Sequence, residues 1–192
     1  MSKPAVSSQK PNPEAMLARR RLSMALATAA AMQIAGASPT PRGPYGFYLQ
    51  DKGLFDRFRD DYAMRRSRGW RVGVSHDSVL ATEDFADSFI GRHAAEWIAR
   101  VQDDAPWHLF VSFVGPHDPF DPPTEYADRY RNAHVPPPIG DGMEGKPGWV
   151  ARRREPATAA QVAETRRQYS AAVELIDAEV GRVLSAVERR GM

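Results

Sequence analysis

Apolar residues recur at intervals of three and four positions in two long stretches of the chain, a spacing that places them along one face of an α-helix. The first stretch predicts a helix over residues 82–101. Thr82 can cap its N-terminus, and Glu83 and Asp84 fall in the first turn, where the helix dipole favours negative charge. Its apolar face consists of Phe85, Phe89, Ala94, Trp97, Ile98 and Val101.

The second stretch predicts a long helix over residues 158–190. Arg189 and Arg190 suit its C-terminus, and Gly191 can adopt the left-handed conformation that often follows a helix. The apolar spacing assigns its buried face to Val162, Tyr169, Val173, Ile176, Val180, Val183, Leu184 and Val187.

The segment from Trp107 to Val114 has a different pattern. It is rich in aromatic and β-branched residues and is too short for a helix between its flanking prolines, so it predicts a strand buried on both faces. Residues 115–123 follow it, and their closely spaced prolines prevent regular structure. A shorter helix is expected over residues 52–64, with loops over 64–78 and 130–156.

The order helix, strand, loop and long helix is typical of an α/β domain with a parallel sheet. A single strand cannot satisfy its own backbone N–H and C=O groups, so neighbouring strands must come from elsewhere. We therefore expect an α/β fold with an incomplete sheet, flanking helices and long irregular loops. The chain is expected to be a slice of a larger domain.

Composition narrows the classes of function. The 192 residues include no Cys, which excludes a disulfide framework, a thiolate metal site and a cysteine nucleophile. The 26 basic and 24 acidic residues are interspersed and give a formal net charge of +2, so we expect no nucleic-acid partner. No stretch reaches the ~18 consecutive apolar residues of a membrane span.

Residues 1–40 differ in character from residues 41–192, which are expected to form the domain. Arg19, Arg20 and Arg21 precede an Ala- and Met-rich apolar run that ends at Ala37. This order over residues 19–37 resembles an export signal of the twin-arginine kind. A low-complexity arm, disordered or marginally helical, is the alternative, so localisation stays open, as does the oligomeric state.

Candidate chemistry concentrates in the loop after the predicted strand. Ligands of open parallel sheets bind at the carboxyl ends of strands, and His117, Asp118 and Asp121 lie there. Prolines on either side would hold the His117 imidazole in a fixed pose, as a general acid requires, although a structural hydrogen-bonding role is the alternative. Asp118, Asp121 and Glu125 are also candidate ligands for a hard cation, but their spacing fits no calcium-loop template.

The other four histidines carry weaker signals. His76 adjoins Asp77, which could orient its imidazole. His93, on the predicted helix, and His108, on the predicted strand, are expected to be packing residues, and His134 has no partner in view. The run of arginines at 152–154 is expected to be solvated.

Two segments resemble the sulfatase family. The first runs from Asp87-Ser88-Phe89-Ile90 through Pro106 to Pro119 and on to Pro123-Thr124-Glu125-Tyr126, and the second is Tyr169 to Arg182, YSAAVELIDAEVGR. Their order and approximate separation are similar to those in the middle of a sulfatase, and the likeness covers residues 44–192. It implies a partial alkaline-phosphatase-like sandwich, with 41–192 as the central slice of a catalytic domain. It also implies calcium and formylglycine as family cofactors, and a small-molecule or carbohydrate sulfate ester as substrate.

The resemblance implies a role for one residue. The His of the family's Pro-His-x-Pro loop contacts the sulfate group, and His117 stands at that position. There it could donate a hydrogen bond to a sulfate oxygen, or to the bridging oxygen that gains negative charge as the S–O bond breaks.

Other parts of the family pattern are missing. The Cys/Ser-x-Pro-Ser-Arg motif that yields the nucleophile is absent, as are the calcium ligands, and residues 38–42 match the motif only superficially. We therefore expect a sulfatase-like hydrolase by family that is inactive as this chain alone. Hydrolysis of phosphonate or phosphate monoesters, and a non-catalytic truncated module, are the alternatives.

Overall fold

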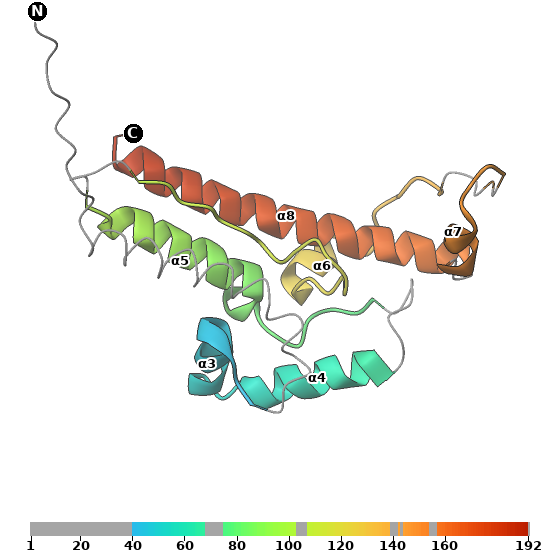
Figure 1. The fold of residues 1–192 in the computed structure, drawn as a ribbon, viewed down its shortest axis with the longest axis horizontal. Coiled ribbons are helices and arrows are strands. Elements are labelled where there is room, and N and C mark those ends of the chain that lie inside the picture. Colours follow the sequence, from blue (N-terminus) through green and yellow to red (C-terminus); the bar gives the residue numbers. More distant parts are fainter. Residues whose placement is uncertain are drawn as a thin grey trace, which may run out of the picture.

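The computed structural model describes residues 40–67, 75–102, 107–138, 142, 144–153 and 157–191. These ranges hold helices α3 (Gly43–Asp51), α4 (Phe55–Ser67), α5 (Ala86–Arg100), α6 (Thr124–Tyr130), α7 (Gly148–Arg153) and α8 (Ala159–Arg189), and the 3-10 helix η1 (Thr82–Asp84). Helices α5 and α8 lie side by side, α6 packs on α8, and α3 contacts α4 near the start of α5 (Figure 1).

The long helix α8 confirms the helix predicted over residues 158–190. The Thr158 side chain accepts the N–H of Gln161, and the Gln161 side chain accepts the N–H of Thr158, so the two residues form a capping box. After the helix, Gly191 has a φ of 73°, which is the left-handed conformation expected at that position.

The buried face of α8 differs from the prediction. Tyr169, Val173, Val180 and Leu184 are exposed. The buried residues are Gln168, Ala171, Ala172, Leu175, Glu179 and Ala186. Close packing of α8 against α5 and α6 selects small side chains: a Cβ atom added to Gly91 of α5 would lie 2.3 Å from Oε2 of Glu179. The prediction was wrong because it chose the face by hydrophobicity and not by how closely the helices approach.

The helix predicted over residues 52–64 is confirmed as α4, which begins three residues later than predicted; the helix α3, which was not predicted, precedes it. They are separated at Gly53, whose φ of 69° lies in the left-handed region. Their apolar side chains form a core with the start of α5, made of Tyr45, Leu49, Phe55, Leu80, Phe89 and Ile90. The hydroxyl of Tyr45 donates to the backbone oxygen of Asp84 at 2.8 Å, which ties α3 to η1.

Helix α5 begins four residues later than the predicted start. Thr82 belongs to η1, and Phe85 occupies the N-cap position in an extended conformation. The hydroxyl of Thr82 donates to Oε2 of Glu125 at 2.8 Å and caps no helix. Thr82 therefore connects η1 with α6.

Residues 107–114 are extended but form no strand, and no strand occurs in the described ranges. A strand requires a hydrogen-bonded neighbour, and this segment runs alongside the pair α5 and α8 instead (Figure 1). Phe110 is 72% exposed, so burial on both faces is also wrong. The α/β sandwich implied by the sulfatase resemblance is therefore not seen in the described residues, which are helical or irregular.

Helices α6 and α7 complete the described part. α7 lies within residues 130–156, which were expected to be irregular, and α6 packs through Tyr126 against Ala171 and Leu175 of α8. None of the described helices is both long enough and apolar enough to cross a membrane. The export signal or arm proposed for residues 1–40 falls almost wholly on residues 1–39, outside the described residues.

Candidate functional site

The proline-rich loop over residues 115–123 borders a cavity. Helices α3, α4, α5 and α8 contribute the other walls. Tyr45, Phe58, Tyr62 and Phe85 supply aromatic surface, while Asp87, His117 and Asp121 supply the groups that can carry charge. Two of these three ionisable residues, His117 and Asp121, belong to the loop. The position of the loop therefore determines which ionisable side chains line the cavity.

His117 is the most accessible ionisable residue of this lining, with 71% of its side chain exposed. Its Nδ1 atom lies 2.7 Å from the backbone oxygen of Asp118 and 2.9 Å from Oδ1 of the same residue. A carbonyl oxygen only accepts hydrogen bonds, so Nδ1 carries a proton. Both contacts use Nδ1, which leaves Nε2 for a ligand. Nε2 can donate a hydrogen bond only when the ring is doubly protonated.

Asp87, in the first turn of α5, holds the start of the loop. Its Oδ1 accepts the N–H of Val114 at 2.6 Å, and its Oδ2 accepts the N–H of Gly115 at 3.1 Å. The residue is only 2% exposed. Burial raises the pKa of Asp87, the hydrogen bonds from Gly115 and Val114 oppose that rise, and the nearby negative charge of Glu179 adds to it.

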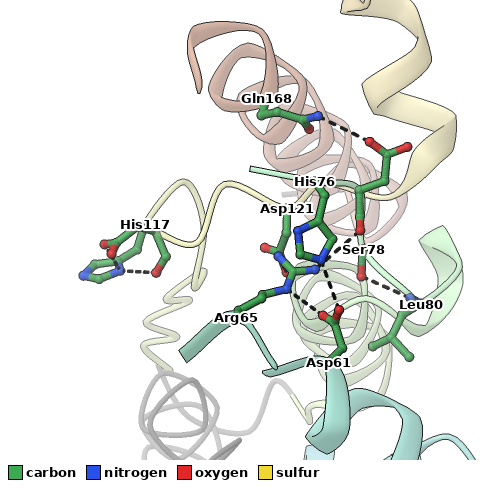
Figure 2. Close-up of polar contacts among 10 residues, drawn as sticks. Asp61, Arg65, His76, Ser78, Leu80, His117, Asp121 and Gln168 are labelled. Carbon is green, nitrogen blue, oxygen red and sulfur yellow. Dashed lines mark hydrogen bonds and ion pairs between the residues drawn. The ribbon is translucent and has the colours of Figure 1, made fainter. Parts of the chain in front are cut away.

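A buried ionic cluster lies at the other end of the loop (Figure 2). The Arg65 guanidinium is 2.6 Å from Oδ2 of Asp61 and 3.1 Å from Oδ2 of Asp121. Oδ1 of Asp61 is also 3.1 Å from Nε2 of His76. Asp61 and Arg65 are one turn apart on α4, so the cluster connects α4 to the loop and to the segment that carries His76.

The charges in this cluster are not balanced one to one, because two carboxylates face a single arginine. Burial raises the pKa of Asp121 to about 7; the Arg65 charge opposes that rise, and the charges of Asp61 and Asp87 add to it. Asp121 therefore changes its charge near neutral pH, unlike an ordinary carboxyl.

The predicted pairing of His76 with Asp77 is wrong. His76 contacts Asp61, while Asp77 forms an ion pair with Arg131 at 2.5 Å and accepts a hydrogen bond from Gln168. These partners lie on distant elements, so adjacency in sequence did not reveal them. The contacts with Arg131 and Gln168 also lower the pKa of Asp77, although its burial acts in the opposite direction.

The three carboxylates considered as cation ligands have separate partners. Asp118 contacts His117, Asp121 contacts Arg65, and Glu125 contacts Arg129 at 3.0 Å. The described residues contain no group of three or more His, Cys, Asp or Glu side chains that could hold a metal ion. Calcium, which the family resemblance implies, therefore does not fit the described part of the chain, and we derive no step through it.

The remaining histidines lie outside the cavity lining. His93 contacts the Phe89 ring at 4.1 Å between centroids, but it is exposed, as are His108 and His134. The packing roles expected for His93 and His108 are wrong to that extent. The side chains of the arginine run 152–154 are outside the described residues.

Sequence reasoning missed Asp61 and Arg65, and it used Asp87 only as part of a motif. Neither was singled out, because alternating charges, such as those around Asp61, usually lie on an exposed helix face. The four-residue interval between them is compatible with an ion pair on one helix, and that was the available signal. Their burial depends on the loop that covers them.

Comparison with known proteins identifies a family. A family model described as Sulfatase matches residues 43–192. The chain is also similar to an arylsulfatase of Clostridium perfringens (strain 13 / Type A), with 24% identity over 110 residues, which is 54% of this chain and 23% of that protein. The chain thus spans about a quarter of the length of this curated relative. Because the family match covers most of the sequence, including the His117 loop and α8, this chain belongs to the sulfatase family.

Proposed function

We propose that this chain supplies the substrate-contact loop of a hydrolase that cleaves sulfuric esters, with His117 as the residue that meets the sulfate group. Membership of the sulfatase family supports the reaction class. The observation that carries the role of His117 is its geometry: Nδ1 is engaged by Asp118, and the rest of the ring is exposed beside a cavity.

The chemistry assigned to His117 follows from the fixed proton on Nδ1. In the protonated ring, Nε2–H donates to an oxygen of the anion R–O–SO₃⁻. In a complete catalytic domain, a nucleophile that this chain does not supply would form a bond to sulfur as the bond between sulfur and the bridging oxygen breaks; the electron pair of the broken bond stays on that oxygen, and the Nε2 proton transfers to it to give the alcohol R–OH. The Asp118 carboxylate lies beside the ring, with its Oδ1 2.9 Å from Nδ1.

The proposal separates binding from turnover. Sulfatases generally depend on calcium and formylglycine, whereas this chain has no Cys and lacks the family's nucleophile motif. We therefore assign to it a sulfate-contacting surface that does not turn over substrate without the rest of a catalytic domain. The organic part of the ester, a small molecule or a carbohydrate, is not assigned.

A titration of the full chain tests this function. Isothermal titration calorimetry measures the binding of inorganic sulfate at constant ionic strength in the wild type and in His117→Ala, and the NMR signal of the His117 Cε1–H reports the same binding wherever His117 is present. His93→Ala is the matched control, because His93 is another exposed histidine but lies on α5, outside the cavity lining. Saturable binding is expected in the wild type and in His93→Ala, and its loss in His117→Ala.

Two further arms distinguish the alternatives. Methylphosphonate in place of sulfate tests the alternative that the chain belongs to a phosphonate or phosphate monoester hydrolase. Tighter binding of methylphosphonate than of sulfate would favour that alternative. An aryl sulfate with calcium tests turnover, which we expect to equal that of buffer. Binding of sulfate that survives His117→Ala would overturn the role of His117, and hydrolysis that depends on His117 would overturn the proposed inactivity.

A further inference from the structure

The backbone that carries His117 is held by a buried carboxylate from a different element. Asp87 Oδ1 lies 2.6 Å from the nitrogen of Val114 and 3.2 Å from that of Gly115, and its Oδ2 lies 3.1 Å from the latter. Val114 and Gly115 come directly before Pro116 and His117. Two successive N–H groups thus converge on one carboxylate, which fixes the direction in which the chain enters the loop.

Gly115 is required for this contact. A Cβ atom at this position would lie 2.7 Å from Oδ2 of Asp87 and 3.0 Å from Cδ1 of Ile176. The backbone therefore lies between α5 and α8 with no space for a side chain. At the other side of the turn, the N–H of His117 points to the oxygen of Val114, at 3.4 Å. This longer contact is weaker than the bonds to Asp87, which are bonds to a carboxylate.

Burying Asp87 costs free energy that a neutral side chain would not cost, because a carboxylate loses its hydration. Backbone N–H groups compensate for part of this loss, and the N-terminal turn of α5 favours negative charge. A carboxylate also differs from a neutral side chain in having two acceptor oxygens, and both are used here.

We propose that Asp87 is a positioning residue, whose carboxylate fixes the backbone at residues 114 and 115 and thereby sets where the His117 imidazole meets a sulfate oxygen. This inference rests on the proposed function of His117. Asp87 acts through the backbone and does not itself contact the anion. Displacement of the imidazole by about 1 Å would misalign its hydrogen bond, and such shifts strongly reduce binding and catalysis.

The test combines two readouts on the full chain. Hydrogen exchange reports the Val114 and Gly115 amides, and the His117 Cε1–H signal reports the apparent dissociation constant of inorganic sulfate. In Asp87→Ala we expect both amides to exchange roughly tenfold faster or more, because each loses a bond to a charged acceptor. We expect sulfate to bind roughly tenfold more weakly, because the imidazole is no longer held in place.

Asp87→Asn is the conservative variant. Its side-chain oxygen can still accept the N–H of Val114 and, at the longer distance of 3.2 Å, that of Gly115, while its NH₂ group cannot replace the second acceptor of Gly115. Exchange should therefore stay near the wild-type rate at Val114 and rise less at Gly115 than in Asp87→Ala, and sulfate affinity should be intermediate. If Asp87→Ala does not fold, amide exchange and sulfate affinity are measured in Asp87→Asn instead.

Two control variants separate positioning from general destabilisation. Glu96→Gln removes a carboxylate from α5 that is 42% exposed, and Thr158→Ala weakens the chain at the cap of α8. Both should leave sulfate affinity unchanged. Affinity that falls equally in Thr158→Ala would mean that Asp87 matters only for stability, and the inference would be wrong.

The outcomes distinguish the two proposals. A wild type whose His117 signal does not respond to sulfate contradicts the proposed function, and the positioning role with it. A wild type that responds, with the same affinity in both Asp87 variants, contradicts the positioning role alone. Unchanged amide exchange at Val114 and Gly115 in Asp87→Ala also contradicts it.

Discussion

The two ends of one proline-rich loop place ionisable groups in opposite environments. At the start, the side chains of His117 and Asp118 are 71% and 55% exposed, and they contact each other. At the end, Asp121 faces Arg65, whose side chain is 2% exposed, and the pair is joined to Asp61 of α4. An exposed ionisable group can contact a ligand, whereas the charge of a buried group affects the free energy of unfolding. Substitutions at the two ends should therefore affect different measurements.

The largest effect is expected from Arg65→Met, at the buried end. The variant leaves Asp61 and Asp121 without their shared cation, and breaking a buried ion pair costs about 3–5 kcal/mol. Urea denaturation at neutral pH measures this loss in the free energy of unfolding. The matched variant Arg59→Met lies on the same helix but pairs with the exposed Asp56 and Asp60, and it should change stability little. Equal losses in the two variants would contradict the structural role given to the buried cluster.

The next effect concerns pH and the buried carboxyl of Asp121. Its pKa is raised from 3.8 to about 7 by burial, so in that range the folded state binds a proton that the unfolded state has released. Stability should therefore fall as pH rises from about 4 to about 7, and level off outside this window, where the two states carry the same charge.

Urea midpoints over this pH range measure the effect. We expect the wild type to lose about 4 kcal/mol relative to Asp121→Asn, which has no proton to release at this site. Asp118→Asn removes a carboxylate from the exposed end of the same loop and should keep the wild-type slope. A wild-type slope in Asp121→Asn would show that other groups cause the pH dependence.

Local signals in the sequence explain which parts of the fold were predicted. The start of α8 at Thr158 and the left-handed Gly191 after its end depend on interactions within a few residues, and both predictions are confirmed. The face of α8 is set by the neighbouring helices, and the apolar pattern selected Tyr169 and Leu184, which are exposed. Residues 107–114 have the composition of a strand, but a strand also needs a hydrogen-bonded neighbour, and the described residues supply none.

The candidate site likewise has one part that local sequence signals reveal and another that depends on long-range contacts. The prolines and the histidine of residues 115–123 are visible as a local motif, so His117 could be selected from the sequence alone. The contacts of Asp87 with Val114 and of Arg65 with Asp121 join residues that are far apart in the chain. The sequence shows Asp87 and Arg65 only as ordinary charged residues, because their burial depends on how the loop packs.

A smaller effect is expected where the loop begins. Gly115→Ala would place a Cβ atom 2.7 Å from Oδ2 of Asp87, and crowding of a packed interior typically costs about 1–3 kcal/mol. Gly181→Ala is the matched control, since a Cβ there meets nothing within 4 Å, and alanine in a helix is better than glycine by about 0.5–1 kcal/mol. The two variants should thus shift the urea midpoint in opposite directions. If Gly115→Ala is as stable as the wild type, the close fit between the loop and Asp87 is not maintained in solution.

The smallest effect on stability is expected at the exposed end, in His117→Ala. The side chain is mostly exposed, and both of its polar contacts in the described part of the chain are with the adjacent Asp118. The free energy of unfolding should therefore change by no more than about 0.5 kcal/mol. The same variant should lose its response to sulfate, whereas Asp121→Asn at a pH where it is folded should keep that response. A large loss of stability in His117→Ala would mean that the imidazole helps to hold the loop, and its exposure would then no longer indicate a ligand-binding role.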